Sequence, residues 1–194
     1  MIVEAKNKPL SILIPIIGFG KAGGYRVLSE LANYWKRAGN RVVFLVDNRT
    51  QAPYFPTDAD ILYFDNNGAL SNTLHGCKGF DVKGNALSIY VGMWRALNKI
   101  AVDYDILLAN HSLTALPVAF CRAGRAKKFY YVQAYEPEYY ELESGRRAKI
   151  LKLLSLLSYS LPLTQVANAP IYVNYRKVRA KAWIPPGLER SNFY

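Results

Sequence analysis

A glycine-rich segment near the N-terminus has the composition of a phosphate-binding loop. It reads Gly18-Phe19-Gly20-Lys21-Ala22-Gly23, follows an apolar run and precedes an amphipathic one. Glycines at such a junction leave backbone N–H groups accessible at the start of a helix, where a phosphate binds well. We therefore predict a loop that holds a phosphate group through the residues Gly20, Lys21, Gly23, Gly24 and Arg26.

Polar side chains follow two later apolar runs, at the point where each run ends. Asn110 and His111 follow the first run, and Gln133 follows the second. Because the carboxyl ends of parallel strands meet at one edge of a sheet, we expect these side chains near the glycine-rich loop. A glutamine can hydrogen-bond a sugar hydroxyl but cannot take a proton, so Gln133 is expected to position a ligand.

An acidic and aromatic segment begins directly after Gln133, with Tyr135 and Glu136 at its start. Carboxylates beside aromatic faces suit the binding of sugar rings, whereas Glu138 and Glu141 are equally typical of the first turn of a helix. The candidate catalytic residues are therefore Gln133, His111 and Glu136. The candidate residues for binding such a ligand are Asn110, His111, Tyr135 and Glu136.

The elements that position these residues alternate between apolar runs and amphipathic runs, which predicts an α/β fold with a Rossmann-like parallel sheet flanked by helices. In the helix expected over 86–102, the apolar face comprises Leu87, Tyr90, Val91, Trp94, Leu97 and Ala101. Strands are expected near 10–17, 41–47, 61–65, 105–109, 128–133, 163–167 and 182–184. A first helix is expected to follow the glycine-rich loop and to stop at Gly39. Further helices are expected over 86–102, 113–123, 138–161 and 169–178.

Composition limits the class of protein. The chain has 194 residues, 51% of them hydrophobic, which is enough for one sizeable core. A formal charge of +11 calls for an anionic ligand or surface. The two cysteines, Cys77 and Cys121, have no pairing or metal-binding spacing. His75 and Cys77 lack two further ligands nearby, so we expect no metal site.

A basic cluster indicates where part of the charge acts. Arg146, Arg147, Lys149 and Lys152 precede or interrupt the leucine-rich stretch 150–161. Cations beside exposed apolar residues suit an anionic membrane surface, although an ordinary solvated basic face fits equally well. No nucleic-acid-binding module is present, so we expect no nucleic-acid partner. No apolar stretch reaches the ~18–20 residues that span a bilayer.

Two other function classes remain open at this point. The glycine-rich segment satisfies GxGxxG, and Asp47 closes the next apolar run, where a dinucleotide-binding domain has its ribose-binding carboxylate. The chain could accordingly be the NAD(P)-binding domain of an oxidoreductase. A non-catalytic binding module, in which the glycines only form a turn, is the other alternative.

The chain resembles the N-terminal domain of GT-B glycosyltransferases of the family 4 type over nearly its whole length. Residues 23–32, GGYRVLSELA, are similar to the family's first helix, and 38–42 to its entry into the second strand, with Asn40 in place of the usual histidine. Residues 131–137, YVQAYEP, look like a segment of rhamnosyltransferase-like members. Residues 184–188, IPPGL, resemble the approach to the second domain.

The resemblance implies an acceptor-side domain over 1–187 and the start of a linker over 188–194, leading to a C-terminal domain that binds the donor. It implies a hexosyltransferase-like enzyme of the EC 2.4 class, inactive without that second domain. A nucleotide sugar is then a substrate rather than a cofactor. The acceptor is a saccharide or a lipid-linked molecule, which Asn110, His111, Tyr135 and Glu136 would bind. Transfer with retention is implied, with Gln133 standing where many retaining members have a histidine. The resemblance also implies a cytoplasmic location, either free or peripheral at the inner face of the membrane, and a role in polysaccharide biosynthesis.

Overall fold

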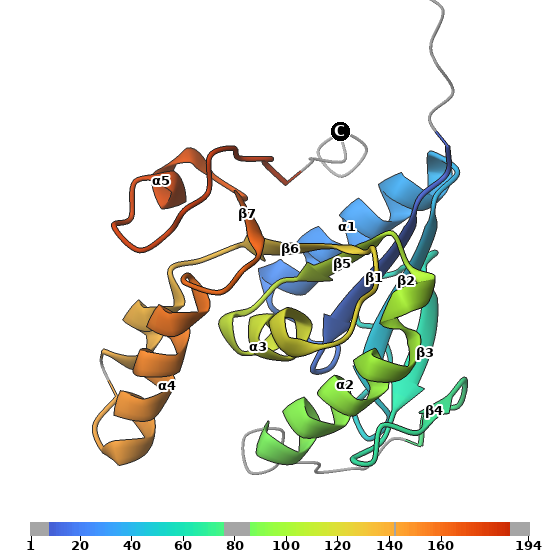
Figure 1. The fold of residues 1–194 in the computed structure, drawn as a ribbon, viewed down its shortest axis with the longest axis horizontal. Coiled ribbons are helices and arrows are strands. Elements are labelled where there is room, and N and C mark those ends of the chain that lie inside the picture. Colours follow the sequence, from blue (N-terminus) through green and yellow to red (C-terminus); the bar gives the residue numbers. More distant parts are fainter. Residues whose placement is uncertain (1–7, 76–85, 142, 187–194) are drawn as a thin grey trace, which may run out of the picture.

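The computed structural model describes residues 8–75, 86–141 and 143–186, which form an α/β sandwich around one sheet (Figure 1). Its strand order is β4-β3-β2-β1-β5-β6-β7, and all neighbours are parallel except β3 and β4. Strands β1 and β5 lie side by side at the centre, so the chain reverses its direction of winding there. The strands are β1 (Ser11–Ile16), β2 (Arg41–Asp47), β3 (Asp60–Phe64), β4 (Leu70–Ser71), β5 (Ile106–Ala109), β6 (Lys127–Val132) and β7 (Thr164–Ala167).

Helices cover both faces of the sheet, with α1 on one face and α2 and α3 on the other (Figure 1). Helix α4 stands at the β7 side of the molecule and packs against α3 and η2. The α-helices are α1 (Gly23–Arg37), α2 (Ala86–Ile100), α3 (Ser112–Phe120), α4 (Arg146–Ser158) and α5 (Pro170–Val173). The 3-10 helices are η1 (Ala101–Asp103) and η2 (Glu136–Tyr140).

The alternation of side chains along β1 divides the core into two layers. Leu13 packs into the layer that contains Met93 of α2, whereas Ile12 and Ile14 pack into the layer that contains Leu28 of α1. Such a strand, apolar on both faces, is typical of a parallel sheet covered by helices on both sides. The predicted Rossmann-like fold and most of its strand positions are confirmed.

Helix α2 is rotated relative to its predicted apolar face. Leu87 and Trp94 are 80% and 43% exposed, while Ile89 and Met93 are fully buried. Gly92 explains the rotation, because a Cβ at this position would lie 2.5 Å from the carbonyl oxygen of Asp65. The helix therefore turns its glycine toward the loop after β3 and buries Ile89, Met93 and Ala96, which were not predicted, together with Leu97 and Ala101 of the predicted face.

The C-terminal third is less helical than predicted. The helix expected over 138–161 is divided into η2 and α4 by Gly145, whose φ of 110° does not fit a helix. The helix expected over 169–178 ends at Val173, because the chain turns back and the Arg179 N–H donates to Gln165 Oε1 at 2.7 Å. The strand expected at 182–184 is one bridge between Ala167 and Trp183. The predicted boundary at 187–188 lies outside the described residues.

Candidate active site at the carboxyl edge of the sheet

A pocket of about 280 Å³ lies where β1, β5 and β6 end. This is the edge at which open α/β sheets bind their ligands, at the point where the winding reverses. The pocket brings together Gly24 from the glycine-rich loop and the predicted polar residues of the later strands. Its lining consists of Ile17, Ala22, Gly24, Tyr25, Leu28, Asn110, His111, Thr114, Gln133, Ala134, Glu136 and Tyr139.

The N-terminus of α1 forms one wall of this pocket. Ala22 is the N-cap residue and has no side-chain oxygen to accept from the N–H groups of the first turn. The first turn also contains no acidic residue. Gly24 lines the pocket, so an anion bound there would meet the positive end of the helix dipole and its unpaired backbone donors.

The cationic side chains of the predicted phosphate loop lie outside the pocket lining. Lys21 is exposed, and its Nζ lies 5.1 Å from the centroid of the Tyr54 ring. Arg26 is also exposed. Gly20 shapes the wall indirectly, because a Cβ there would lie 2.9 Å from Cε2 of Tyr25. An anion in the pocket would therefore meet backbone groups rather than these two charged side chains.

Gln133 follows β6 and turns its side chain toward the start of α1. Its Oε1 is buried and has no hydrogen-bond partner among the described residues. A Cβ on Gly24 would lie 3.3 Å from that oxygen. Asn168 supports the same corner, since its Nδ2 donates to the Gln133 carbonyl oxygen at 3.2 Å, and its own Oδ1 is likewise buried without a partner in the described chain. Of these two oxygens, the Gln133 Oε1 belongs to a residue of the pocket lining and suits a ligand that brings a hydroxyl group, whereas Asn168 is absent from that lining.

Asn110 and His111 join β5 to α3 and are held by the first turn of that helix. Asn110 donates from Nδ2 to the Pro15 carbonyl oxygen at 3.0 Å, which ties β5 to the end of β1. His111 is the N-cap of α3: its Nδ1 accepts the Leu113 N–H at 3.2 Å, and its own N–H donates to Thr114 Oγ1 at 3.1 Å. The spacing between His111 and Thr114 is that of a capping box.

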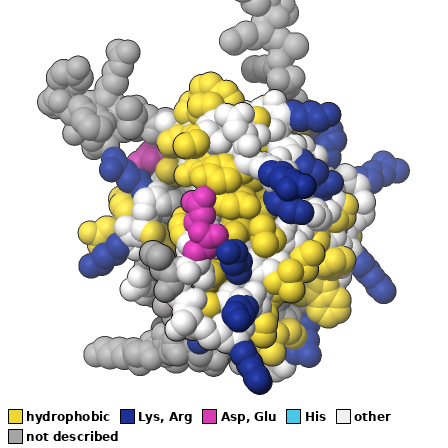
Figure 2. All heavy atoms as spheres, turned by 90° about the vertical axis from the view of Figure 1, so that its left-hand side faces the viewer, with side chains coloured by type: hydrophobic (Ala, Val, Ile, Leu, Met, Phe, Trp, Pro, Cys, Tyr) yellow, Lys and Arg dark blue, Asp and Glu magenta, His cyan; other side chains and the backbone are white. Residues whose placement is uncertain are grey.

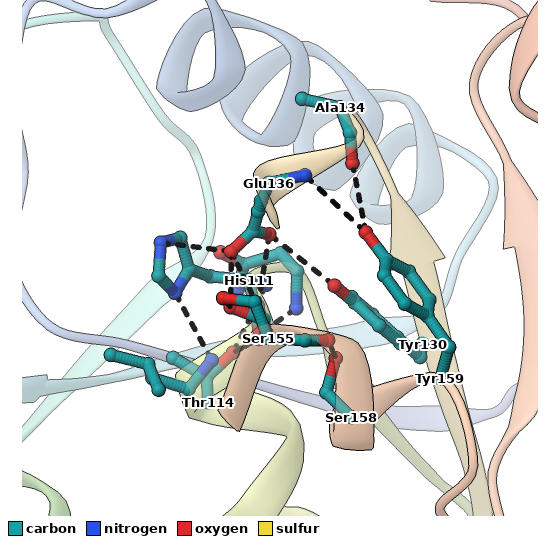
Figure 3. A network of polar contacts seen from close by, with 11 residues as sticks. His111, Thr114, Tyr130, Ala134, Glu136, Ser155, Ser158 and Tyr159 are labelled. Atoms are coloured by element: carbon teal, nitrogen blue, oxygen red, sulfur yellow. Dashed lines mark hydrogen bonds and ion pairs between the residues drawn. The ribbon is translucent and has the colours of Figure 1, made fainter. Parts of the chain in front are cut away.

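Glu136 is the centre of a buried polar network (Figure 3). Its side chain is 4% exposed and accepts the Ser112 N–H at 2.9 Å on each carboxylate oxygen. Ser112 Oγ donates to Glu136 Oε2, and the Tyr130 hydroxyl donates to Oε1 at 3.3 Å. Ser155 of α4 joins the network through a 3.0 Å contact with Ser112 Oγ. A buried carboxylate with this many donors fixes the elements that carry them.

His111 and Glu136 form a pair at the pocket wall, with His111 Nε2 and Glu136 Oε2 3.1 Å apart (Figure 3). Nδ1 accepts the Leu113 N–H, so the hydrogen-bond network assigns the ring proton to Nε2. The Nε2–H group then donates a hydrogen bond to Glu136 Oε2. Both nitrogens of His111 are therefore engaged. In this arrangement His111 could take up a further proton only by giving up its cap bond to Leu113.

Tyrosines surround the buried carboxylate. Burial, followed by the negative charge of Glu136, raises the pKa of Tyr130 far above its ordinary value. The same two causes raise the pKa of Tyr159, whose hydroxyl accepts the Glu136 N–H at 3.4 Å. Both phenols therefore stay protonated at physiological pH, so that Tyr130 donates to the Glu136 carboxylate and Tyr159 donates to the Ala134 carbonyl oxygen.

Tyr135 lies apart from the pocket lining. Its ring stacks between Tyr159 and Tyr175, with centroids 5.6 and 4.2 Å away. Tyr139, from the same segment, lines the pocket instead and is 59% exposed. The turn of η2 decides which of the two tyrosines faces a ligand.

Thr114 and Tyr25 are further lining residues that sequence reasoning missed, although the capping-box spacing could have indicated Thr114.

Asp47, the carboxylate on which an NAD(P) interpretation depends, is not available to a ligand. It is fully buried and accepts from Arg49 through the backbone N–H, Nε and Nη2, at 3.0, 2.8 and 2.6 Å.

The part of the chain that the structure describes has no group of three metal-binding side chains. His75 is tied by its backbone N–H to the Asn48 carbonyl oxygen, and Cys77 lies outside the described residues.

The predicted basic cluster lies on α4, and none of its four residues lines the pocket. Arg146, Arg147 and Lys149 are exposed. Lys152 forms an ion pair with Glu141, with Nζ and Oε1 2.8 Å apart. Within the described residues, no helix combines the length and the apolar character needed to cross a membrane.

No protein-family model and no curated protein sequence matches the chain. Solved structures do match its fold. Sucrose-phosphate synthase from Thermosynechococcus elongatus aligns over 95% of this chain and 50% of its own, with a TM-score of 0.63 at 12% identity. UGT2 of Phytolacca americana, solved with UDP-2fluoro-glucose and pterostilbene, aligns over 95% of this chain and 56% of its own, with a TM-score of 0.58 at 11% identity.

This chain therefore spans about half the length of those two structures. At such low identities the likeness concerns the fold. It confirms the expectation of a mostly parallel α/β sheet flanked by helices, and the chain has the fold of a GT-B Rossmann-like domain.

Proposed function

We propose that this chain is the acceptor-side domain of a GT-B glycosyltransferase, which works with a second domain that binds the donor nucleotide. In this proposal a sugar passes from a nucleotide sugar to a saccharide or lipid-linked acceptor. One observation carries the proposal. In the pocket, the N-terminus of α1, which has no side-chain cap, lies opposite the Oε1 of Gln133, which has no donor among the described residues. One side of the pocket suits a diphosphate, and the other suits a sugar.

The phosphate side acts through the backbone of α1. When the bond between the sugar and the diphosphate breaks, negative charge builds up on the leaving oxygen. N–H groups of Gly23 and Gly24 at the start of α1 would stabilise that charge without reorganising, because the helix holds them in place. Lys21 and Arg26 are close in sequence and add only long-range attraction from their exposed positions.

The sugar side acts through a buried acceptor. Gln133 Oε1 lacks a donor among the described residues, and a sugar hydroxyl would supply one. Asn110, His111 and Tyr139 would complete the wall on the acceptor side. Glu136 would hold this wall in place through His111 and Ser112 rather than contact a substrate.

The finer features of the proposal rest on the sequence resemblance to family 4 and rhamnosyltransferase-like enzymes. These features are transfer with retention, a role in polysaccharide biosynthesis and a cytoplasmic location. The requirement for a second domain is supported by the coverage of the two solved structures, each about twice as long as the part matched here.

The test is a titration of the ¹⁵N-labelled chain, followed through its backbone and side-chain amide resonances. We expect pyrophosphate to shift Gly23 and Gly24, and UDP-glucose to shift these resonances and the Gln133 side-chain amide. Sugar transfer by the chain alone should stay at background. If NADH shifts the resonances near Asp47 and Gly18 while pyrophosphate and UDP-glucose shift none, the dinucleotide-binding alternative replaces this proposal. If none of the three ligands binds, the glycine-rich loop is only a turn.

A further inference from the structure

A column of stacked tyrosine rings leads from the core to the surface beside α5. The centroids of consecutive rings are 5.7, 5.6, 4.2 and 6.1 Å apart, and consecutive ring planes differ by between 13° and 25°. In order from the core outward the members are Tyr130, Tyr159, Tyr135, Tyr175 and Tyr172. The first two are fully buried, whereas the last three are partly exposed. The column therefore holds Tyr172, its last ring, in a fixed orientation at the surface.

The outer end of this column adjoins the pocket. The turn before α5 is tied to the pocket wall, because Asn168 Nδ2 donates to the Gln133 carbonyl oxygen at 3.2 Å. Tyr139 lines the pocket and is 59% exposed. Burial, then the charge of Glu136, and then the nearby Tyr172 raise the pKa of Tyr139. Tyr139 and Tyr172 are therefore neighbours, one at the mouth of the pocket and the other outside it.

An exposed carboxylate lies beside the column. Glu138 accepts a hydrogen bond from the Tyr175 hydroxyl, and its own backbone N–H donates to the Tyr135 carbonyl oxygen at 3.2 Å. A carboxylate has further lone pairs, with which it can accept hydroxyl donors from a ligand. Figure 2 shows the side of the molecule that carries α4 and α5, where acidic side chains lie at the border of a continuous hydrophobic area.

We infer that Tyr139, Tyr172 and Glu138 form a second carbohydrate subsite beside the pocket, and that the acceptor is an oligosaccharide. The inference rests on the proposed function, since it takes the pocket to hold the sugar unit that receives the transferred sugar. The preceding unit would then lie on Tyr139 and Tyr172, outside the pocket. A sugar ring on the exposed part of Tyr172 would extend the column by one layer.

The chemistry of this surface favours a sugar over other ligands. A sugar ring has a C–H face that packs on an aromatic ring and hydroxyl groups that donate to a carboxylate. An acyl chain would leave Glu138 without a donor, and an anion would be repelled by it. Because the column already fixes Tyr172, a sugar would lose little affinity to the ordering of that side chain.

The test uses the 194-residue chain and a carbohydrate array of mono-, di- and trisaccharides of glucose, galactose, mannose and rhamnose. Amide titrations then compare the di- or trisaccharide that binds best with the monosaccharide at its non-reducing end. The measured quantity is the ratio of the two affinities. Y172A and Y172L remove the flat ring, Y172F keeps it, and the control Y34A removes a tyrosine that is 62% exposed on α1. Circular dichroism verifies that each variant is folded.

We expect the parent to bind the oligosaccharide about tenfold more tightly than the monosaccharide, which is the contribution of a good aromatic contact. Y172A and Y172L should lower this ratio to about one, whereas Y172F and Y34A should keep it. The inference is overturned if no member of the array binds, or if the parent's ratio is about one. It is also overturned if Y172L keeps the ratio or if Y34A loses as much as Y172A.

Failure of this inference can be told apart from failure of the proposed function. If pyrophosphate and UDP-glucose bind but the ratio is about one, the second subsite is removed and the proposed function stands. If the ratio and its dependence on Tyr172 are found while neither pyrophosphate nor UDP-glucose binds, the carbohydrate subsite stands and the transferase proposal falls.

Discussion

The carboxylate of Glu136 accepts the backbone N–H of Ser112 through both of its oxygens, each at 2.9 Å. The two residues are 24 positions apart in the sequence. Glu136 thereby occupies the N-terminus of α3, where the helix dipole favours a negative charge. Its second partner at this place is His111, so one buried carboxylate fixes both the helix and the histidine at the pocket wall.

Replacement of Glu136 by alanine should destabilise the fold. The change leaves the buried donors of Ser112 and Tyr130, and the half-buried His111, without their acceptor, so we expect the free energy of unfolding to fall by about 3 kcal/mol. Urea unfolding measures this loss. E143A, at an exposed glutamate, is the control and should stay within about 0.5 kcal/mol of the parent. Equal effects of the two variants would show that the network contributes nothing.

Two adjacent glycines in the first turn of α1 should respond differently to alanine. A Cβ on Gly23 meets no atom within 4 Å, whereas one on Gly24 lies 3.3 Å from Gln133 Oε1 and enters the pocket. G23A should therefore stabilise the helix by about 0.5 kcal/mol and keep pyrophosphate binding. G24A should weaken that binding about tenfold, by obstructing one hydrogen bond to a charged ligand. The amide titration described above compares the two, and similar affinities would remove Gly24 from the binding site.

Gly92 in α2 is expected to be intolerant of alanine even though alanine favours helices. The new Cβ would lie 2.5 Å from the Asp65 carbonyl oxygen, and a backbone atom cannot move aside cheaply. The helix would have to shift on the sheet, at a cost of about 2 kcal/mol. Thermal unfolding of G92A should show a clearly lower midpoint than the parent. A midpoint at or above the parent's would mean that the rotation of α2 has another cause.

Asp105 should make the stability of the chain depend on pH in the acidic range. The Ser11 backbone N–H and Oγ donate to its Oδ2 at 2.8 and 2.7 Å, and these bonds lower the pKa of the Asp105 carboxyl. A carboxyl whose pKa is lowered by folding stabilises the fold above its unfolded pKa of about 3.9 and ceases to do so as the pH falls through its folded pKa.

The variant D105N should therefore have a lower unfolding midpoint than the parent at pH 7, and the difference should shrink toward pH 3. Thermal unfolding across this range gives the comparison. D103N, at a neighbouring exposed aspartate, serves as the control. A difference between D105N and the parent that stays constant with pH would contradict the assigned cause, because an uncharged effect of the substitution does not titrate.

Several features of the fold could be predicted from local patterns. Continuous apolar runs predicted the buried strands, and β2 occupies the residues expected of it, Arg41–Asp47. The end of α1 was predictable because a glycine commonly follows the last turn of a helix. Gly39 does so here, with a φ of 87°. The meeting of the glycine-rich loop, Asn110 and Gln133 at one pocket followed from parallel topology, since strand ends share an edge.

Local patterns could not predict contacts between distant segments. Whether Glu136 faces a substrate or α3 depends on where Ser112 lies, and only the packing of η2 against α3 and α4 decides this. The rotation of α2 depends on the close approach of Gly92 to the loop after β3, which a helical wheel does not contain.

The sequence by itself therefore determined the alternation of the main parallel strands with α1, α2 and α3, the glycine-rich start of α1 and the basic, leucine-rich composition of α4, but not the short strand β4 or the division between η2 and α4. The features that it determined follow from hydrophobic period and from the backbone preferences of glycine, which act over a few residues. Tertiary structure alone decided that Tyr139 and not Tyr135 lines the pocket, and that Ile150, Leu153 and Leu157 face outward. The physical reason is that the exposure of a side chain depends on which surfaces, far apart in the chain, compete to bury it.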